Sequence, residues 1–206
     1  MPRRARTHQR RQPVQRRAED TVAVLLDATE RVLEAQGFHG ATTNHIARTA
    51  GVSIGTLYHY FPTKEALVAG VVHRLWAAEL ETLATRAHLF AELPLEDAIR
   101  EACRALCAYV WSRVDLYRTW YSEASHLGEL GKGLDMSGHA ASMVGGALEH
   151  HAARLRPGLD VTFAADFVVK TALALARTGA RDYPGELESG KLADELALML
   201  SRYLLA

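Results

Sequence analysis

The sequence predicts an all-α fold with about nine helices, arranged as a small N-terminal helical unit followed by a larger helical domain. Along most of the chain, apolar residues recur at intervals of three and four, as they do on one face of a helix. Short Gly or Pro breaks separate these segments, and the alternating pattern of a strand is nearly absent. With 49% apolar and 23% charged residues in a chain of 206, a core can form without disulfides or structural metals.

The breaks divide the chain into segments of helical length. We expect helices at residues 20–36, 43–50, 54–60, 63–88, 95–112, 114–125, 134–155, 159–181 and 187–205. The fourth of these begins beside the short helices and continues into the longer ones. We therefore expect a basic disordered arm at residues 1–19, a first domain at residues 20–62 and a second domain at residues 63–206.

The arm is predicted from an uneven distribution of charge. Residues 1–62 hold nine Arg and no Lys against five acidic residues, whereas residues 63–206 hold 15 Lys and Arg against 19 acidic residues. Seven of the arginines lie in the first 17 residues, which contain no acidic residue. Such an arm favours a polyanionic partner, and a passive solvated tail is the alternative.

The first expected helix places four residues on one face, at i, i+3, i+4 and i+7. They are Leu25, Ala28, Thr29 and Val32. Gly37 suits the left-handed conformation that ends a helix, and Phe38 can supply the apolar contact that follows such an end.

The next two expected helices are short and joined by a tight turn. Thr42 can cap the first and Ser53 the second, because each hydroxyl can accept a hydrogen bond from a backbone N–H of the first turn. Gly51 permits the positive φ of the turn. The side chains expected to face the core are Ile46, Ala47, Ala50, Leu57, Tyr60 and Phe61.

Two short helices joined by a Gly turn, with a small residue at their crossing, predict a helix-turn-helix. In such a unit the second helix lies in the DNA major groove, and its early residues face base edges. Those residues here are Ser53, Ile54, Gly55, Thr56 and His59. Gly55 leaves room for the backbone to approach, and Thr56 offers both a hydroxyl and a methyl group. A corner of two helices that binds nothing is the alternative.

The stretch VLLDATERVLEAQGFHGATTNHIARTAGVSIGTLYHYFPTKEALV resembles the DNA-binding region of tetracycline-repressor-like (TetR family) transcriptional regulators, over about 45 of the 206 residues. The matching elements are Gly37-Phe38, Thr42-Thr43, Ile46-Ala47, Ala50-Gly51-Val52-Ser53, Thr56-Leu57-Tyr58-His59-Tyr60-Phe61 and Lys64-Glu65. Asp27 departs from the pattern, since a small apolar residue is usual there, and Asn44 and His45 occupy variable positions. The resemblance implies a palindromic operator in double-stranded DNA as the partner.

The resemblance also implies roles for individual residues. The residues expected to contact the DNA backbone are Thr43, Tyr58, Tyr60 and Lys64, and those expected to face bases are Gly55, Thr56 and His59. Thr42 is primarily a cap whose hydroxyl can also reach a phosphate. The alternatives are that Tyr60 is simply part of the core and that His45 and His59 are surface residues without a role. Arginines of the arm would suit an adjacent minor groove.

For residues 63–206 the resemblance implies a regulatory domain that dimerises and binds a small-molecule effector. We expect paired C-terminal helices from two subunits to form the dimer interface through Phe163, Phe167, Leu175, Leu196, Leu200 and Tyr203. Packing of these residues within one chain is the alternative, because periodicity does not tell which core an apolar face fills.

An aromatic and sulfur cluster in the middle helices is the candidate effector pocket. Its residues are Trp111, Tyr117, Trp120, Tyr121, His126 and Met143. The same residue types also fill helical cores, and Trp76 is expected to be core. Cys103 and Cys107 lie at i, i+4, as a redox or metal sensor would require, but small buried hydrophobes are the simpler interpretation. A metal site at His139 and His150 or His151 is a weaker hypothesis.

The sequence thus predicts a homodimeric, ligand-responsive repressor in the cytoplasm, with no cofactor and no membrane contact. No apolar run approaches the roughly 18 residues that span a bilayer, and the apolar stretch after the first arginines stops at Asp27, too early for a secretory signal. An enzyme with a helical cavity is one alternative, although no nucleophile elbow, phosphate loop or dinucleotide motif occurs. A TetR-like protein that has lost operator binding is the other.

Overall fold

A computed structural model describes residues 12–86, 92–124 and 137–206 of the chain. Within these residues the regular structure is helical, apart from one isolated antiparallel bridge between Leu155 and Leu205, which confirms the all-α prediction. None of the described helices is long and apolar enough to cross a membrane. The chain divides into two compact units, Met1–Val71 and Val72–Ala206, and the division falls inside helix α4 (Lys64–Ala84).

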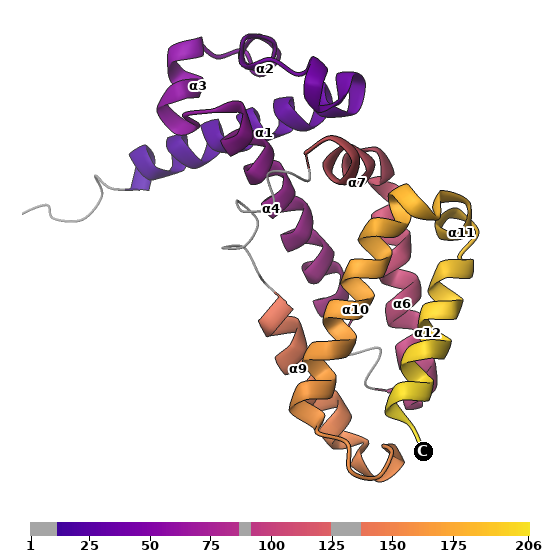
Figure 1. The fold of residues 1–206 in the computed structure, drawn as a ribbon. Coiled ribbons are helices and arrows are strands. Elements are labelled where there is room, and N and C mark those ends of the chain that lie inside the picture. Colours follow the sequence, from indigo (N-terminus) through magenta and orange to yellow (C-terminus); the bar gives the residue numbers. More distant parts are fainter. Residues whose placement is uncertain (1–11, 87–91, 125–136) are drawn as a thin grey trace, which may run out of the picture. The chain divides into compact units, whose positions relative to one another are not determined.

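The first unit contains α1 (Gln12–Gly40), α2 (Thr43–Ala50), α3 (Ile54–Tyr60) and the beginning of α4 (Figure 1). Helix α1 packs against α2, and α2 packs against α3. The four residues predicted to share one face of the first helix are all buried, as are residues of the three other helices. The buried set includes Leu25, Ala28, Thr29, Val32, Ile46, Ala47, Leu57, Leu67 and Val68. Apolar periodicity therefore identified the core of this unit.

Helix α1 differs from the prediction at both of its ends. It begins at Gln12, so residues 12–19, which were expected to belong to a disordered arm, are helical. Gln, Arg, Ala and Glu in this segment are good helix formers and allow the helix to extend without an apolar face. At the other end Gly37 has the predicted positive φ, 66°, and one more short helical turn follows it to Gly40. Residues 1–11 of the expected arm lie outside the described part of the chain.

The second unit contains the rest of α4 and the helices that follow it in the chain (Figure 1). They are α6 (Leu95–Ser112), α7 (Val114–Thr119), a π-helical segment (Trp120–Ala124), α9 (Ser137–His150), a 3-10 turn (Ala152–Arg154), α10 (Val161–Asp182), α11 (Pro184–Glu188) and α12 (Lys191–Leu204). Helix α9 lies along α10, α12 lies along α6, and α10 also contacts α6 and α7. The core of this unit therefore lies between α6, α10 and α12.

The last expected helix, residues 187–205, is divided in the structure. Gly190 has φ 80°, a left-handed conformation that ends α11 and precedes α12. Apolar periodicity continues across this position, so the sequence pattern did not reveal the break. The helix expected at residues 114–125 likewise changes from α to π geometry at Trp120.

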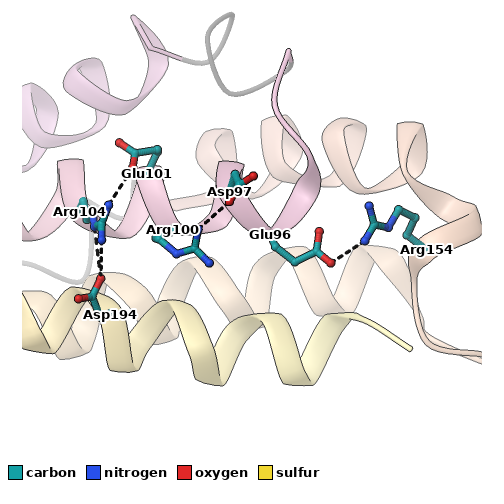
Figure 2. A network of polar contacts seen from close by, with 7 residues as sticks. All are labelled: Glu96, Asp97, Arg100, Glu101, Arg104, Arg154 and Asp194. Atoms are coloured by element: carbon teal, nitrogen blue, oxygen red, sulfur yellow. Dashed lines mark hydrogen bonds and ion pairs between the residues drawn. The ribbon is translucent and has the colours of Figure 1, made fainter.

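A row of ion pairs lies along the outer side of α6 (Figure 2). Arg104 binds Asp194 of α12 at 3.1 Å, and Glu96 binds Arg154 of the 3-10 turn at 2.5 Å. These side chains are about half exposed. Exposed ion pairs contribute little to stability, so the row orients the neighbouring elements while the apolar core holds them together.

Candidate nucleic-acid interface and internal cavity

The turn between α2 and α3 has the geometry of a helix-turn-helix. Gly51 adopts φ 70° and ψ 25°, and the N–H of Val52 donates to the carbonyl of Ala47 at 3.0 Å. Ala47 is 3% exposed and Leu57 of α3 is fully buried, so the two helices are locked through small and apolar side chains. This confirms the tight turn predicted at Gly51.

Both predicted caps are present. The Thr42 hydroxyl accepts from the N–H of His45 at 3.2 Å, and the Ser53 hydroxyl accepts from the N–H of Thr56 at 3.0 Å. The Ser53 and Thr56 hydroxyls also share a hydrogen bond of 2.8 Å. These bonds determine the start of α3 and the position of the Thr56 side chain before any partner is bound.

Helix α3 buries one face and exposes the other. Leu57 is fully buried, whereas the side chains of Ile54 and Tyr58 are 38% and 49% exposed. The remaining exposed residues of this face are Ser53, Gly55 and His59, and Thr56 and Tyr60 are half-buried. A Cβ added at Gly55 would meet only the Ser53 hydroxyl, at 3.7 Å, so the fold itself does not require glycine there.

Three residues predicted to contact the DNA backbone make contacts within the unit. The Tyr58 hydroxyl and the Thr43 hydroxyl share a hydrogen bond of 3.0 Å, which joins α3 to α2. The Lys64 ammonium donates to the carbonyl of Phe38 at 3.0 Å and lies 4.0 Å from the centre of its ring. A lysine near a helix end satisfies carbonyls that have no partner within the helix. Lys64 therefore has a structural role at the end of α1.

An apolar cavity of about 490 Å³ lies within the second unit. Side chains of α4, α6, α9, α10 and α12 line it. They include Leu80, Leu83, Ile99, Ala102, Cys103, Leu106, Met143, Val144, Val169, Leu173 and Leu200, and His139, His150 and His151 also border the cavity. A cavity of this volume with mainly apolar walls suits a small lipophilic molecule.

A buried ion pair joins α4 to α10 in the same unit. The Arg177 guanidinium donates twice to Glu79 Oε2, from Nε at 2.9 Å and from Nη2 at 2.5 Å. Glu79 is fully buried, and its burial raises the pKa of its carboxyl, although the Arg177 charge opposes the rise. Arg177 also lies 4.5 Å from the ring centre of Trp76, which meets Trp120 edge to face.

An aromatic patch lies on the surface of α10 and α12. Phe163 is 60% exposed and stacks on Phe167, which is 43% exposed, with ring centres 5.9 Å apart. Tyr203 of α12 meets Phe167 at 5.1 Å, and Met199 nearby in α12 is 44% exposed. Clustered exposed aromatic side chains of this kind mark interaction surfaces.

We compared the sequence with models of known protein families. Residues 25–71 match the sequence model of bacterial regulatory proteins of the tetR family. Residues 94–204, more than half of the chain, match the model of the tetracyclin repressor-like C-terminal domain. The chain belongs to the TetR family of transcriptional regulators.

Individual relatives match this TetR-family regulator less completely. The HTH-type transcriptional regulator UidR of Escherichia coli K12 is 36% identical over 59 residues, which are 29% of this chain and 30% of UidR. The chain thus spans less than a third of the length of this relative. A TetR-family regulator from Pectobacterium atrosepticum has a similar fold, with a TM-score of 0.72 over 93% of this chain and 97% of its own, at 19% identity. The transcriptional regulator FadR from Bacillus subtilis, in complex with stearoyl-CoA, aligns with a TM-score of 0.61 over 88% and 98%, at 18% identity.

The predicted effector residues and the cavity coincide at one position. Met143 lines the cavity, whereas Tyr117, Trp120 and Tyr121 lie near the Glu79–Arg177 pair. Tyr117 and Trp120 are buried there, Trp111 and Tyr121 are half-buried, and His126 lies outside the described residues. The cavity walls were missed because Leu, Ala and Val at helical spacing resemble ordinary core, and Glu79 was missed because an isolated acidic residue gives no signal.

The predicted dimerisation residues divide into two groups. Phe163 and Phe167 are exposed, and Leu175 and Tyr203 are half-buried. Leu196 is 2% exposed and Leu200 is 5% exposed, so both are covered by their own chain and do not offer a surface to a partner. This corrects their assignment: the inward face of α12 packs on its own subunit, while Met199 lies on the outward face.

The two cysteines are buried free thiols. Burial raises the pKa of Cys103 to about 12 and that of Cys107 to about 11, which leaves little reactive thiolate near neutral pH. Among the described residues, no group of three His, Cys, Asp or Glu side chains is arranged to hold a metal ion.

Proposed function

We propose that this TetR-family protein is a homodimeric repressor that binds a palindromic operator and releases it when a small apolar effector is bound. The observation that carries the proposal is the capped α3, whose buried Leu57 face leaves an opposite face of exposed polar and small residues. Such a helix can enter the major groove with its first residues toward the bases.

The exposed face of α3 supports base recognition. Thr56 is positioned by Ser53 and carries a hydroxyl and a methyl group. Gly55 is not required by packing and allows the backbone to approach DNA closely. His59 is exposed one turn further along. Phosphates would be contacted by Tyr58 and Thr43, whose shared hydrogen bond already orients both hydroxyls.

A dimer follows from the short length of α3. Helix α3 has only seven residues, so one copy reads few base pairs, whereas two copies related by a twofold axis can read a palindrome. The Phe163–Phe167 stack, with Tyr203 and Met199, is the surface that we propose for the interface. Burial of apolar area is the main favourable contribution to such an association.

The cavity is the proposed effector site, and α4 is the proposed link to DNA binding. Leu80 and Leu83 of α4 line the cavity, and the same helix begins in the unit that contains α2 and α3. An effector that favours one position of α4 would change the separation of the two recognition helices, which must be about 34–36 Å for adjacent major grooves. FadR, which shares the fold, provides a precedent for a lipophilic ligand.

A mobility-shift titration on the DNA that flanks the protein's own gene tests the proposal. We expect specific binding that weakens steeply with salt, because Arg and Lys contacts to phosphates release counterions. Thr56→Ala, which removes the hydroxyl proposed to face the bases, should weaken this binding. Thr85→Ala, which removes an exposed threonine hydroxyl of the second unit, is its matched control. Equal affinity for the flanking DNA and for scrambled DNA would instead support the TetR-like protein that has lost operator binding.

A further inference from the structure

Among the described residues of the second unit, three buried polar atoms of neighbouring side chains have no hydrogen-bond partner. They are Trp76 Nε1, Glu79 Oε1 and the Tyr117 hydroxyl. Buried polar atoms in folded proteins are nearly always hydrogen-bonded, so each exception calls for an explanation. Each of these three neighbouring atoms can form a hydrogen bond with a bound polar group or with a water molecule.

The three atoms belong to one cluster. Trp76 and Glu79 are three residues apart on α4 and therefore lie on the same face of the helix. Arg177 contacts both of them, binding Glu79 through Oε2 only and covering the Trp76 ring at 4.5 Å. The Tyr117 hydroxyl lies near enough to lower the pKa of Glu79, yet it makes no hydrogen bond of acceptable geometry.

Along α4 and α10 the cluster lies within one helical turn of residues that line the apolar cavity. On α4, Glu79 is followed by Leu80, which lines the cavity. On α10, Arg177 lies four residues after Leu173, another lining residue. One helical turn advances about 5.4 Å. The cluster therefore lies about one helical turn beyond the apolar walls; Glu79 and Tyr117 are fully buried, and the side chains of the cluster do not line the cavity.

A third helix, α6, continues from the cavity to the cluster in the same way. Cys103 lines the cavity, and Cys107 follows it one turn later. The charge of Glu79 contributes to the raised pKa of the Cys107 thiol, which places this thiol near the carboxylate. The cluster is thus bordered by three of the five helices that line the cavity.

The charges and the orphaned atoms select a neutral polar group. Glu79 and Arg177 neutralise each other, so a charged ligand group would be buried without a counter-charge, which is unfavourable. Glu79 Oε1 accepts a hydrogen bond, Trp76 Nε1 donates one, and the Tyr117 hydroxyl can do either. A hydroxyl group is the smallest group that can donate to the first atom and accept from one of the other two.

We propose that the effector is a neutral lipophilic alcohol or phenol, whose hydroxyl donates to Glu79 Oε1 and accepts from Tyr117 or Trp76 while its apolar body occupies the cavity. This inference rests on the proposed function, which assigns the cavity to the effector. It adds the polar end of the site and the chemical class of the ligand.

Displacement of the fluorescent apolar probe N-phenyl-1-naphthylamine from the full-length protein tests this. The competitors are 1-decanol, 1-fluorodecane, decanoate and decylamine, which share a chain and differ in the terminal group. We expect 1-decanol to bind at least tenfold more tightly than each of the others, because the hydroxyl alone satisfies the cluster without adding charge. Equal binding of 1-decanol and 1-fluorodecane, or tighter binding of either charged competitor, would overturn the proposed ligand class and leave the cavity assignment intact.

Variants of the polar cluster test where the hydroxyl of the ligand binds. Tyr117→Phe removes only an unpartnered hydroxyl, so the fold should be retained and the preference for 1-decanol over 1-fluorodecane should fall severalfold. Trp76→Phe, which removes the unpartnered N–H, should reduce the same ratio. Tyr109→Phe is the matched control, because the Tyr109 hydroxyl already donates to the carbonyl of Leu75 at 3.0 Å, and its ratio should stay at the wild-type value.

Two outcomes distinguish a failure of the proposed polar end from a failure of the cavity as the effector site. A ratio unchanged in both Tyr117→Phe and Trp76→Phe would overturn the assignment of the polar end. If the probe does not bind at all, or no competitor displaces it, then the cavity is not an effector site, and the effector part of the proposed function fails together with this inference.

Discussion

Removal of one partner from the buried Glu79–Arg177 pair should destabilise the second unit far more than removal of both. Glu79→Met leaves the Arg177 guanidinium buried, since its side chain is only 13% exposed and Glu79 itself is fully buried. Breaking a buried ion pair in this way costs about 3–5 kcal/mol. Because the guanidinium keeps its contact with the Trp76 ring at 4.5 Å, we expect a loss near the lower end, about 3 kcal/mol.

The double variant Glu79→Met with Arg177→Met removes both charges and keeps unbranched side chains; methionine is close to glutamate in length and shorter than arginine. Its free energy of unfolding should lie within about 1 kcal/mol of the wild-type value, because an apolar replacement of a buried pair is often neutral or stabilising. For a chain of this length, a loss of 3 kcal/mol corresponds to a fall of about 6–12 °C in the unfolding midpoint.

Urea and thermal unfolding, followed by circular dichroism at the helical band, measure these differences. Asp194→Asn, which breaks the exposed pair with Arg104 shown in Figure 2, is the control and should leave the midpoint nearly unchanged. If the losses of the two single variants simply add in the double variant, the two charges do not stabilise each other, and the reasoning from burial is wrong.

Four further outcomes are expected. Thr56→Ala should weaken binding to the operator by about 1–3 kcal/mol while leaving binding to scrambled DNA unchanged, as measured by mobility shift; an equal loss on both would contradict base recognition. Phe167→Asp should convert the dimer to a folded monomer in sedimentation experiments, and a dimer of unaltered stability would place the interface elsewhere. Deletion of residues 1–11, which hold five of the seven arginines of the arm, should make the salt dependence of DNA binding shallower, whereas an unchanged slope would indicate a passive tail. Because its pKa is raised to about 11 and it does not line the cavity, Cys107 should resist alkylation by iodoacetamide at pH 8 until urea unfolds the protein, and rapid modification of Cys107 in the native protein would contradict its burial.

The helix-turn-helix could be predicted from sequence because its determinants are local. Gly51 needs a positive φ that few other residues adopt, and the Thr42 and Ser53 caps bind N–H groups only three residues away. Leu25 and Leu57 follow the spacing of one helix face each. None of these features requires knowledge of which distant segment lies opposite.

The dimer surface could be predicted only in part. Phe167 and Leu200 both lie on apolar faces of the last two long helices, yet one side chain is 43% exposed and the other 5%. Periodicity shows that a helix has an apolar face. It does not show whether that face meets another helix of the same chain, a cavity or a second subunit.

From the sequence alone, one could determine the family, the helical fold and the surface of α3, because each depends on residues close together in the chain. Only the tertiary structure located the cavity and joined Glu79 to Arg177, since the two residues are 98 positions apart and no sequence pattern pairs them. The cavity is a space left where helices far apart in sequence pack incompletely, and the ion pair depends on which faces of α4 and α10 meet. Those relations arise from the packing of side chains in three dimensions, and a helix's own sequence does not contain them.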